Sequence, residues 1–409
     1  MWTAALILPD CARAQATPHV TTLYSFNAGG NSAFAYPNAP VTIGAKGVLY
    51  GTTSNNGGAV YSLAPPASPG SPWTASLLHE FAGGGDGYHP GAGVVIGSGG
   101  ILYGTTVSGG TAVCSCGTVF SLTPPASSGG AWTESVIYSF TGGGDGAAPL
   151  AGVVIGKNGV LYGTTSSGGE FLYYGTVYSL TPPSSPGGSW TETTLYSFSG
   201  FPDAGDPYAS VAIGSGALYG TTFSGGTANA GTVFSLAPPG SPGAAWTENV
   251  LYSFTDNTGA FPSGSVAPGS GGVLYGTVQL GGNRACLAGC GVVFSLAPGG
   301  AWTETVLYNL RAASGGNPYA GVTIGNGGVL YGTAFDGGTG TCTGGCGVLF
   351  SLTPPVSPGS GWTETVLHRF QGADGANPAA GVTISKSGVI YGTTSIDGTM
   401  GGGTVFEFK

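Results

Sequence analysis

The side chains of this sequence that could carry out chemistry are few. Among 409 residues there are 17 aspartates and glutamates, and four histidines, at His19, His79, His89 and His368. The sequence holds no Ser/His/Asp set, no HExxH motif and no glycine-rich phosphate loop leading into a helix. Carboxylates from separate loops can still converge on a sugar bond. The sequence therefore favours a non-catalytic protein, with a polysaccharide-acting hydrolase or lyase as the alternative.

Tyrosines and aspartates interrupt several glycine-rich loops. Tyrosine rings in turns suit stacking on sugars, and nearby carboxylates suit sugar hydroxyls or a calcium ion. Asp-Gly pairs are also ordinary turn formers, so each aspartate has a structural explanation as well. We expect no metal site or cofactor other than calcium. The candidate ligand-binding residues are Asp86, Tyr88, His89, Asp145, Tyr173, Tyr174, Asp206, Tyr208 and Tyr319.

Six cysteines form three close pairs. In an exported protein, close pairs of this kind predict disulfides that staple long loops. A zinc site made by the two CxxxC pairs is the alternative. The predicted pairs are Cys114–Cys116, Cys286–Cys290 and Cys342–Cys346.

The elements that must position these residues are seven copies of one unit, each marked by a Tyr-Gly-Thr phrase. The second copy contains four strand-like segments, at Gly93–Ile96, Ile101–Thr106, Gly117–Leu122 and Trp132–Phe140. Four antiparallel strands per unit make one propeller blade. We therefore predict an all-β fold, a single seven-bladed β-propeller with repeats of about 57 residues. The seven tyrosines are Tyr50, Tyr103, Tyr162, Tyr219, Tyr275, Tyr331 and Tyr391.

The two ends of the repeat region complement each other. The last unit stops after "GTVFEFK" and lacks its fourth strand, whereas "VTTLYSF" near the start is a fourth strand without a unit before it. We expect this N-terminal strand, including Leu23–Phe26, to pair beside Val405–Phe408 and close the ring. The propeller is thus expected to span residues 17–409 as one domain.

The phrase "LYGTTxxGG", followed by "GTVFSL" and then "WTExxLYSF", resembles the GloVer tandem repeat of bacterial surface and secreted proteins. The resemblance covers Leu23 to Phe408, and all seven tyrosine phrases and six Trp-Thr dipeptides conform to it. It implies an exported, often surface-associated protein. It carries over no catalytic residues.

The repeats differ mainly in two segments. The segment from the phrase tyrosine to the aromatic residue of the third strand varies most, from Tyr50–Tyr61 to the longer Tyr275–Phe294. The crossover from the fourth strand to the next unit varies too. Loops alternate between the two ends of an up-and-down blade, so both variable segments belong to one face. We expect a binding site on that face, at the mouth of the central channel.

The charge and composition of the chain restrict the classes of partner that it could bind. The net charge is −9 and the eight basic residues are scattered, which excludes nucleic-acid binding and disfavours anionic membranes. No apolar run is long enough to span a bilayer. Residues 1–16 resemble a secretion signal with a small-x-small cleavage site at Ala14–Ala16. We expect a secreted or cell-surface monomer that recognises a glycan or a surface protein.

Overall fold

The computed structural model describes most of the chain. The predicted secretion signal (1–16) lies outside the described residues. The described residues are 18–29, 33–68, 70–111, 113–127, 129–185, 187–241, 243–255, 258–282, 286, 289–357 and 359–409.

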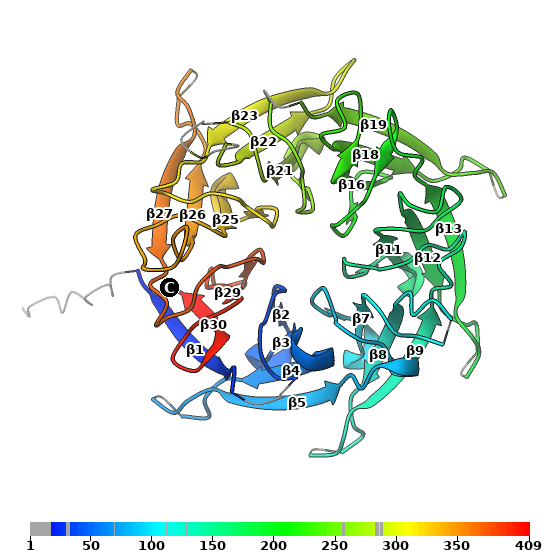
Figure 1. Cartoon of the computed structure of the whole chain (residues 1–409), viewed down its shortest axis with the longest axis horizontal. Helices are drawn as coiled ribbons and strands as arrows, with labels where there is room; N and C mark the ends of the chain where they lie inside the picture. The colour runs from blue at the N-terminus through cyan, green and yellow to red at the C-terminus, as the bar shows by residue number, and fades with distance from the viewer. Residues whose placement is uncertain are drawn as a thin grey trace, which may run out of the picture.

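Seven four-stranded antiparallel sheets stand radially around a central axis, which confirms the predicted seven-bladed propeller (Figure 1). The innermost strands are β2 (Thr42–Ile43), β6 (Val95–Ile96), β10 (Val154–Ile155), β15 (Ala212–Ile213), β20 (Ala267–Pro268), β24 (Thr323–Ile324) and β28 (Thr383–Ile384). The second strands are β3 (Leu49–Thr53), β7 (Leu102–Thr106), β11 (Leu161–Thr165), β16 (Leu218–Thr222), β21 (Leu274–Val278), β25 (Leu330–Ala334) and β29 (Ile390–Thr394).

The two outer strands of each blade are longer. The third strands are β4 (Ala59–Ala64), β8 (Thr118–Thr123), β12 (Thr176–Thr181), β18 (Thr232–Ala237), β22 (Val292–Ala297), β26 (Val348–Thr353) and β30 (Gly401–Phe408). The outermost strands are β5 (Thr74–Glu80), β9 (Thr133–Ser139), β13 (Thr191–Ser197), β19 (Thr247–Ser253), β23 (Thr303–Asn309), β27 (Thr363–Arg369) and β1 (Val20–Asn27). Blades are numbered one to seven by the order of their second strands.

The innermost strands are shorter than the sequence predicts. The expected strand Gly93–Ile96 is only β6, two residues long. Gly93 lies against the innermost segment of the neighbouring blade, where an added Cβ would stand 2.5 Å from the Pro40 carbonyl oxygen. Around the axis the seven blades converge, so backbones crowd one another before a long ladder can form.

Strand β1 completes the sheet of blade seven. It pairs antiparallel with β30, from Val20 opposite Phe408 to Asn27 opposite Gly401. Its Phe26 is fully buried beside Tyr61 of blade one, with ring centroids 5.1 Å apart. The outermost strand of blade seven therefore comes from the N-terminal part of the chain (Figure 1).

The repeated phrase joins neighbouring blades. In every blade, the first threonine after Tyr-Gly donates its Oγ1 hydrogen to a backbone oxygen of the next blade. Thr164, for example, donates to the Ala209 oxygen at 3.1 Å, and Thr393 of blade seven donates to the Ala39 oxygen of blade one at 3.0 Å. The other five donors are Thr52, Thr105, Thr221, Thr277 and Thr333.

The hydrophobic core is divided among the seven seams between blades. Each seam buries aliphatic side chains and an edge-to-face aromatic or aromatic-leucine contact; Phe140 against Tyr178 is one case, at 5.0 Å between ring centroids. In six of the seven seams, the phrase tyrosine packs on the Trp-Thr tryptophan of the next blade, as Tyr103 does on Trp190. Tyr331 packs instead against the cluster that contains Phe406, because blade seven has no Trp-Thr dipeptide. Because each blade is covered by its two neighbours, the unit must be repeated for any copy to be stable.

No α-helix occurs within the described ranges. Seven short 3-10 turns lie in loops: η1 (Ala45–Gly47), η2 (Asn55–Gly57), η3 (Gly84–Asp86), η4 (Ser98–Gly100), η5 (Lys157–Gly159), η6 (Ser270–Gly272) and η7 (Asn326–Gly328). A two-stranded ribbon, β14 (Ala204–Gly205) with β17 (Ser224–Gly225), adds to blade four. In the part of the chain that is described, no helix is long and apolar enough to cross a membrane.

Candidate functional site

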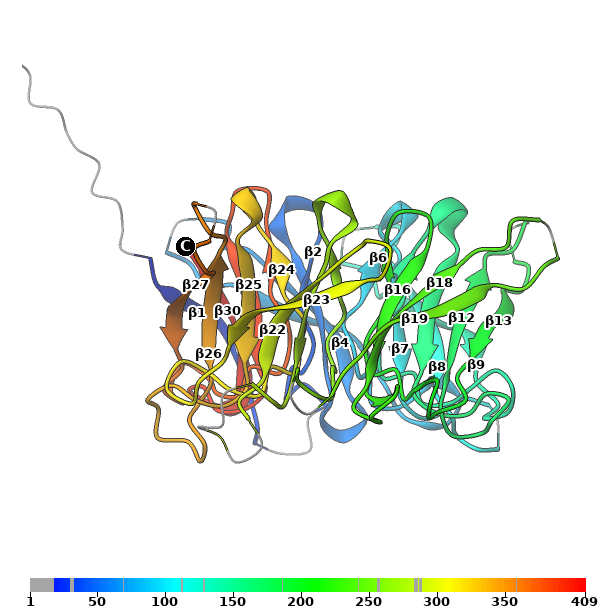
Figure 2. The same cartoon turned by 90° about the horizontal axis from the view of Figure 1, so that it is seen from above.

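The crossover segments and the loops between second and third strands share one face of the ring, here called the crossover face. A crossover forms an isolated β-bridge with the loop after the second strand of the blade that it enters, as Tyr88 does with Ser108 in blade two and Ala260 does with Leu280 in blade five. The strands run between this face and the opposite one, which Figure 2 shows edge-on.

At each seam on this face, one residue before a buried proline is held in the left-handed region. In blade four this residue is Asp206, with φ 56°. Its N–H donates to Tyr174 O of the preceding blade at 3.0 Å, and its carbonyl accepts from Phe223 N at 2.9 Å. All seven blades repeat this geometry. The seven residues, here called the pre-proline positions, are Tyr36, His89, Ala148, Asp206, Phe261, Asn317 and Asn377.

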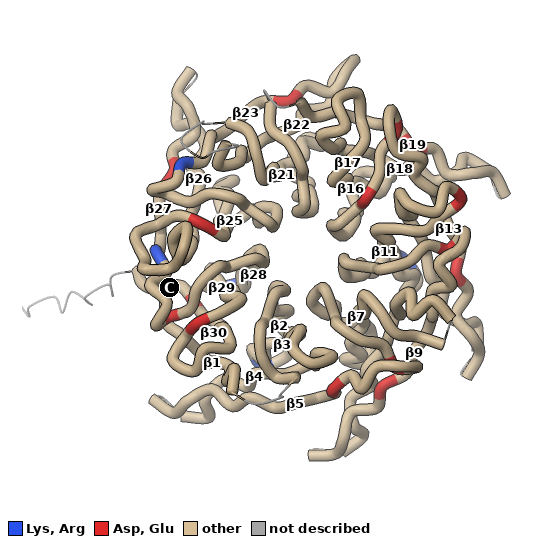
Figure 3. The backbone as a smooth tube through the Cα atoms, viewed as in Figure 1, with Lys and Arg blue, Asp and Glu red and all other residues tan. Residues whose placement is uncertain are grey.

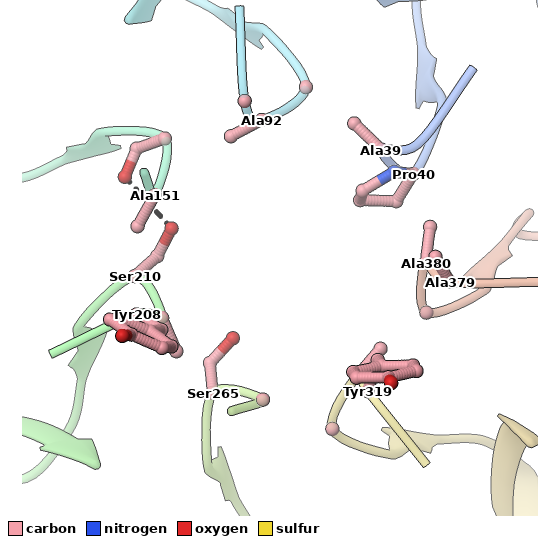
Figure 4. Close-up of a pocket in the computed structure, with 18 of the residues that line it drawn as sticks. Ala39, Pro40, Ala92, Ala151, Tyr208, Ser210, Ser265, Tyr319, Ala379 and Ala380 are labelled. Carbon is pink, nitrogen blue, oxygen red and sulfur yellow. Dashed lines mark hydrogen bonds between the residues drawn. The ribbon is translucent and has the colours of Figure 1, made fainter. Parts of the chain in front are cut away.

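The residue after each of these prolines faces the central channel. The channel holds a cavity of about 390 Å³, within the size range of small-ligand sites. Its wall is mostly glycine, alanine, serine, threonine and valine with Leu150, and among the described residues Tyr208 and Tyr319 are its aromatic side chains. Figure 4 shows the two tyrosine rings on one side of the opening with Ser265 between them. The two rings are 38% and 40% exposed.

Aromatic residues behind these tyrosines hold them in place. Tyr208 stacks on Phe223 with centroids 4.8 Å apart, and Phe223 stacks in turn on Phe261 at 4.9 Å. Tyr319 meets Phe335 edge-to-face at 4.8 Å. Blades four to six thus form an aromatic arc around part of the channel mouth, which offers preformed apolar contact surface at low entropic cost.

Polar groups between the two tyrosines are arranged as a chain. Gln279 Nε2 donates to Ser263 Oγ at 2.8 Å, and the Ser263 hydroxyl donates to the Tyr319 carbonyl at 2.8 Å. On the other side, Ser210 donates to the Gly152 carbonyl at 2.8 Å. Burial, followed by the charge of Asp206, raises the pKa of Tyr208, so this hydroxyl is neutral and can both donate and accept.

Of the sequence-predicted residues, the structure brings Tyr208 and Tyr319 to the channel wall, and Asp206 lies two positions before Tyr208 without lining the cavity. Asp206 accepts a hydrogen bond from Ser224 Oγ at 2.5 Å. His89 occupies a pre-proline position in blade two, and its ring lies 4.1 Å from that of Tyr88.

Asp86 and Asp145 lie instead near the outermost strands. Asp145 accepts hydrogen bonds from Tyr138 OH, Thr141 N and Thr141 Oγ1, at 2.9, 2.8 and 2.6 Å. Asp86 accepts from Ala82 N at 3.0 Å and lies 3.6 Å from His79 Nε2. These contacts hold the start of the crossover against the preceding outermost strand. Acidic segments appear around the rim of the ring in Figure 3.

The same rim carries three glutamates whose pKa values are raised. Burial raises the pKa of Glu134, Glu192 and Glu248 to about 7, and aspartates across the seams add to each rise. The Oε1 atoms of Glu134 and Glu248 are buried with no hydrogen-bond partner. These groups lie on outermost strands, away from the channel wall, so their titration bears on stability.

Tyr173 and Tyr174 belong to a loop of blade three. Tyr173 is 73% exposed, and Phe171 and Leu172 beside it are exposed as well. Tyr174 is half-buried against Gly200 and Gly205 of the following crossover, where side chains at either glycine would collide with its ring. This loop is separate from the residues that line the channel.

The three predicted disulfides are present. Cys114 bonds to Cys116, Cys286 to Cys290 and Cys342 to Cys346, each within one loop of the crossover face. With all six thiols paired, the four-cysteine zinc site does not form. Among the described residues, no group of three or more histidine, cysteine, aspartate or glutamate side chains could hold a metal ion.

Sequence reasoning missed Phe223, Phe261 and Phe335. Phe223 and Phe335 each directly follow a second strand, and Phe261 directly precedes a proline, so each occupies a position that the other repeats fill with unrelated residues. Comparing the seven copies position by position, rather than loop by loop, would have found them.

Comparison with known proteins supports the fold. A solved ancestral GH74 enzyme is 14% identical with a TM-score of 0.57, covering 92% of this chain and 48% of that one. A putative 6-phosphogluconolactonase from Bacteroides uniformis ATCC 8492 is 15% identical, with a TM-score of 0.51 and coverage of 84% and 88%. A putative oxidoreductase (glucose dehydrogenase) from Thermus thermophilus is 15% identical, with a TM-score of 0.43 and coverage of 96% and 100%. At such identities the first two similarities show the fold alone.

No curated protein sequence matches this chain. The model of the Gloeobacter/Verrucomicrobia repeat matches residues 13–201 and 172–406, overlapping in blade three and together covering almost all of the described ring. The chain therefore belongs to the Gloeobacter/Verrucomicrobia repeat family.

Proposed function

We propose that this chain is an exported, non-catalytic binding protein that recognises a glycan at the mouth of its central channel. The observation that carries the proposal is the pair of half-exposed tyrosines, Tyr208 and Tyr319, on a wall that carries no other aromatic side chain within the described residues. Amphipathic rings held by a rigid aromatic layer present a flat apolar face with a polar edge, which matches the alternating faces of a sugar ring.

The absence of catalytic groups from the described wall favours binding over turnover. Apart from the two tyrosines, no ionisable side chain lines the cavity within the described residues. General acid–base catalysis at a glycosidic bond needs carboxyl groups within hydrogen-bonding reach of the substrate. The three disulfides on the crossover face suit an oxidising, extracellular setting.

The test is binding of the whole chain to a panel of soluble polysaccharides and oligosaccharides, measured by affinity electrophoresis and calorimetry. Tyr208→Ala and Tyr319→Ala should each weaken retention about tenfold, the equivalent of ~1.4 kcal/mol for a lost aromatic contact. Tyr173→Ala is the matched control, since it removes an exposed tyrosine outside the channel and should leave retention unchanged.

Three results would contradict the proposal. If no polysaccharide is retained, the chain is not a glycan-binding protein. If Tyr173→Ala abolishes retention while the channel variants do not, the site is elsewhere. Release of reducing sugar by the wild-type chain, lost in Asp86→Asn or Asp145→Asn, would establish the hydrolase or lyase alternative.

A further inference from the structure

A second hollow lies on the crossover face between blades six and seven, and its Asn377 stands two residues before Ala379 of the channel wall. We call it the acidic cleft. It is lined by Asp336, Asp397, Asn377, Thr341, Thr343 and Cys342, with Phe335 and Ile396 as apolar walls. Phe335 is the ring that supports Tyr319, so the cleft and the channel site share one wall. A ligand longer than one sugar ring could therefore contact both.

Neither carboxylate of the cleft is neutralised. Among the described residues, no lysine, arginine or histidine nitrogen forms an ion pair with Asp336 or Asp397. Asp336 Oδ2 accepts a hydrogen bond from Asn317 Nδ2 at 2.6 Å. Asp397 Oδ2 lies 3.6 Å from Cys342 Sγ, which is disulfide-bonded and has no hydrogen to donate. Two carboxylates thus face a hollow to which the described residues bring no ion-paired counter-charge.

A largely buried amide supplies a third acceptor. Asn377 is only 7% exposed, and its Nδ2 donates to the Phe335 carbonyl at 3.0 Å. No described group donates to its Oδ1. Because Asn377 lines the cleft, its amide oxygen is an acceptor that a ligand donor could reach there.

The wall that carries the threonines is held in one conformation. The Cys342–Cys346 bond closes its loop, Gly345 N donates to Cys342 O at 2.9 Å, and Gly337 N donates to Gly344 O at 2.8 Å. A preformed wall reduces the ordering cost of binding. The cleft is therefore built in advance of any ligand.

We propose that the acidic cleft binds the protonated amino group of an amino-sugar residue, in a glycan whose neighbouring sugar stacks on Tyr319. This inference rests on the proposed glycan-binding function. An ammonium group has three donors, and Asp336, Asp397 and the Asn377 amide oxygen offer three acceptors. Charge-assisted hydrogen bonds to carboxylates are about twice as strong as neutral ones. Calcium fits less well, because it takes six to eight oxygen ligands.

The experiment compares three oligosaccharides of equal length by calorimetry with the whole chain: a glucosamine hexamer, an N-acetylglucosamine hexamer and cellohexaose. The glucosamine hexamer should bind about tenfold more tightly than the other two. Asp336→Asn/Asp397→Asn should remove this preference and leave the affinity for cellohexaose unchanged. Because Asp336 also anchors Asn317, the single variant Asp397→Asn keeps the test valid if the double variant melts early. Asp86→Asn, a rim carboxylate, is the matched control and should keep the preference.

Each outcome has a distinct meaning. Equal affinity for all three hexamers, or a preference that survives Asp397→Asn and the double variant, overturns the amino-sugar inference while the glycan-binding function stands. A lysine hexapeptide that binds as tightly as the glucosamine hexamer overturns the glycan as the source of the amine. Stoichiometric binding of calcium alone that is lost in Asp397→Asn overturns the ammonium assignment. If no hexamer binds, the proposed function fails and this inference fails with it.

Discussion

Three glutamates near the starts of outermost strands predict that the ring is less stable at mildly alkaline than at mildly acidic pH. Glu134, Glu192 and Glu248 each have a pKa raised to about 7 from an ordinary 4.5, chiefly by burial. Between these two values the folded chain binds more protons than the unfolded chain. The free energy of unfolding must therefore fall as pH rises through this window, and the loss is complete above the folded pKa.

The size of the effect follows from the shift and the exposure. A rise from 4.5 to about 7 corresponds to at most ~3.4 kcal/mol for each glutamate. The side chains are only half-buried, so solvent screening reduces this to about 1 kcal/mol each. Ionisation of the three glutamates together should lower the free energy of unfolding by about 3 kcal/mol between pH 5 and pH 8. His79, whose pKa is lowered mainly by burial, acts in the opposite direction, because its contribution is lost as pH falls.

Urea unfolding followed by tryptophan fluorescence at pH 5, 6, 7 and 8 measures the dependence. The triple variant Glu134→Gln/Glu192→Gln/Glu248→Gln replaces the ionisable groups with neutral isosteres and should flatten it, while the His79 contribution cancels in the comparison. Glu170→Gln, at an exposed loop position, is the control and should keep the wild-type slope. A triple variant with the full wild-type slope would refute the assignment to these glutamates.

Three further perturbations test the architecture. Thr164→Val removes the buried hydrogen bond to the Ala209 oxygen and should lower the free energy of unfolding by about 1–3 kcal/mol. Thr164→Ser keeps the hydroxyl and should retain most of that stability. An equal loss in both variants would assign the stability to the methyl group instead. Deleting residues 18–27 exposes the side chains that pack on Leu23 and Phe26, and should lower the free energy of unfolding in urea by at least about 3 kcal/mol. An unchanged urea midpoint would mean that β1 contributes no stability. Ala148→Gly relieves a left-handed alanine and should raise the thermal midpoint, by up to about 1 kcal/mol of stability; a lower midpoint would contradict the strain.

The repeated phrase was enough to predict the blades because its residues act through local periodicity and neighbour contacts. The phrases "LYGTT" and "GTVFSL" recur almost unchanged and are buried at nearly every position, as strands covered on both faces by neighbouring blades are. The same residues therefore pair in the same register in β11 with β12 and in β16 with β18. A recurring phrase carries no information about how a strand lies relative to the ring axis. That direction depends on sheet twist, which accumulates from the innermost to the outermost strand.

This is why the candidate site could be predicted only in part. Asp86 and Tyr208 both lie in crossover segments, so the type of loop does not distinguish them. The outermost strands follow the circumference, so an aspartate soon after such a strand stays at the rim, whereas a residue shortly before an innermost strand reaches the channel (Figure 1). Asp86 precedes β6 by nine positions and Tyr208 precedes β15 by four. The distance to the next innermost strand, rather than the loop, decides which residues face the channel.

The pre-proline positions also bear on whether the mouth has a function. Their left-handed backbone is fixed by bonds to two neighbouring segments in all seven blades, and glycine would adopt it without strain. The chain uses glycine at many other positive φ angles, yet none of these seven positions carries it. Asn317, Asn377 and Asp206 tolerate the conformation comparatively well, but Tyr36 and Phe261 do so at a cost of about 1–2 kcal/mol each. Phe261 offsets that cost by packing against the buried cluster of its seam and by stacking on Phe223, so this position uses its side chain where glycine would supply only backbone freedom.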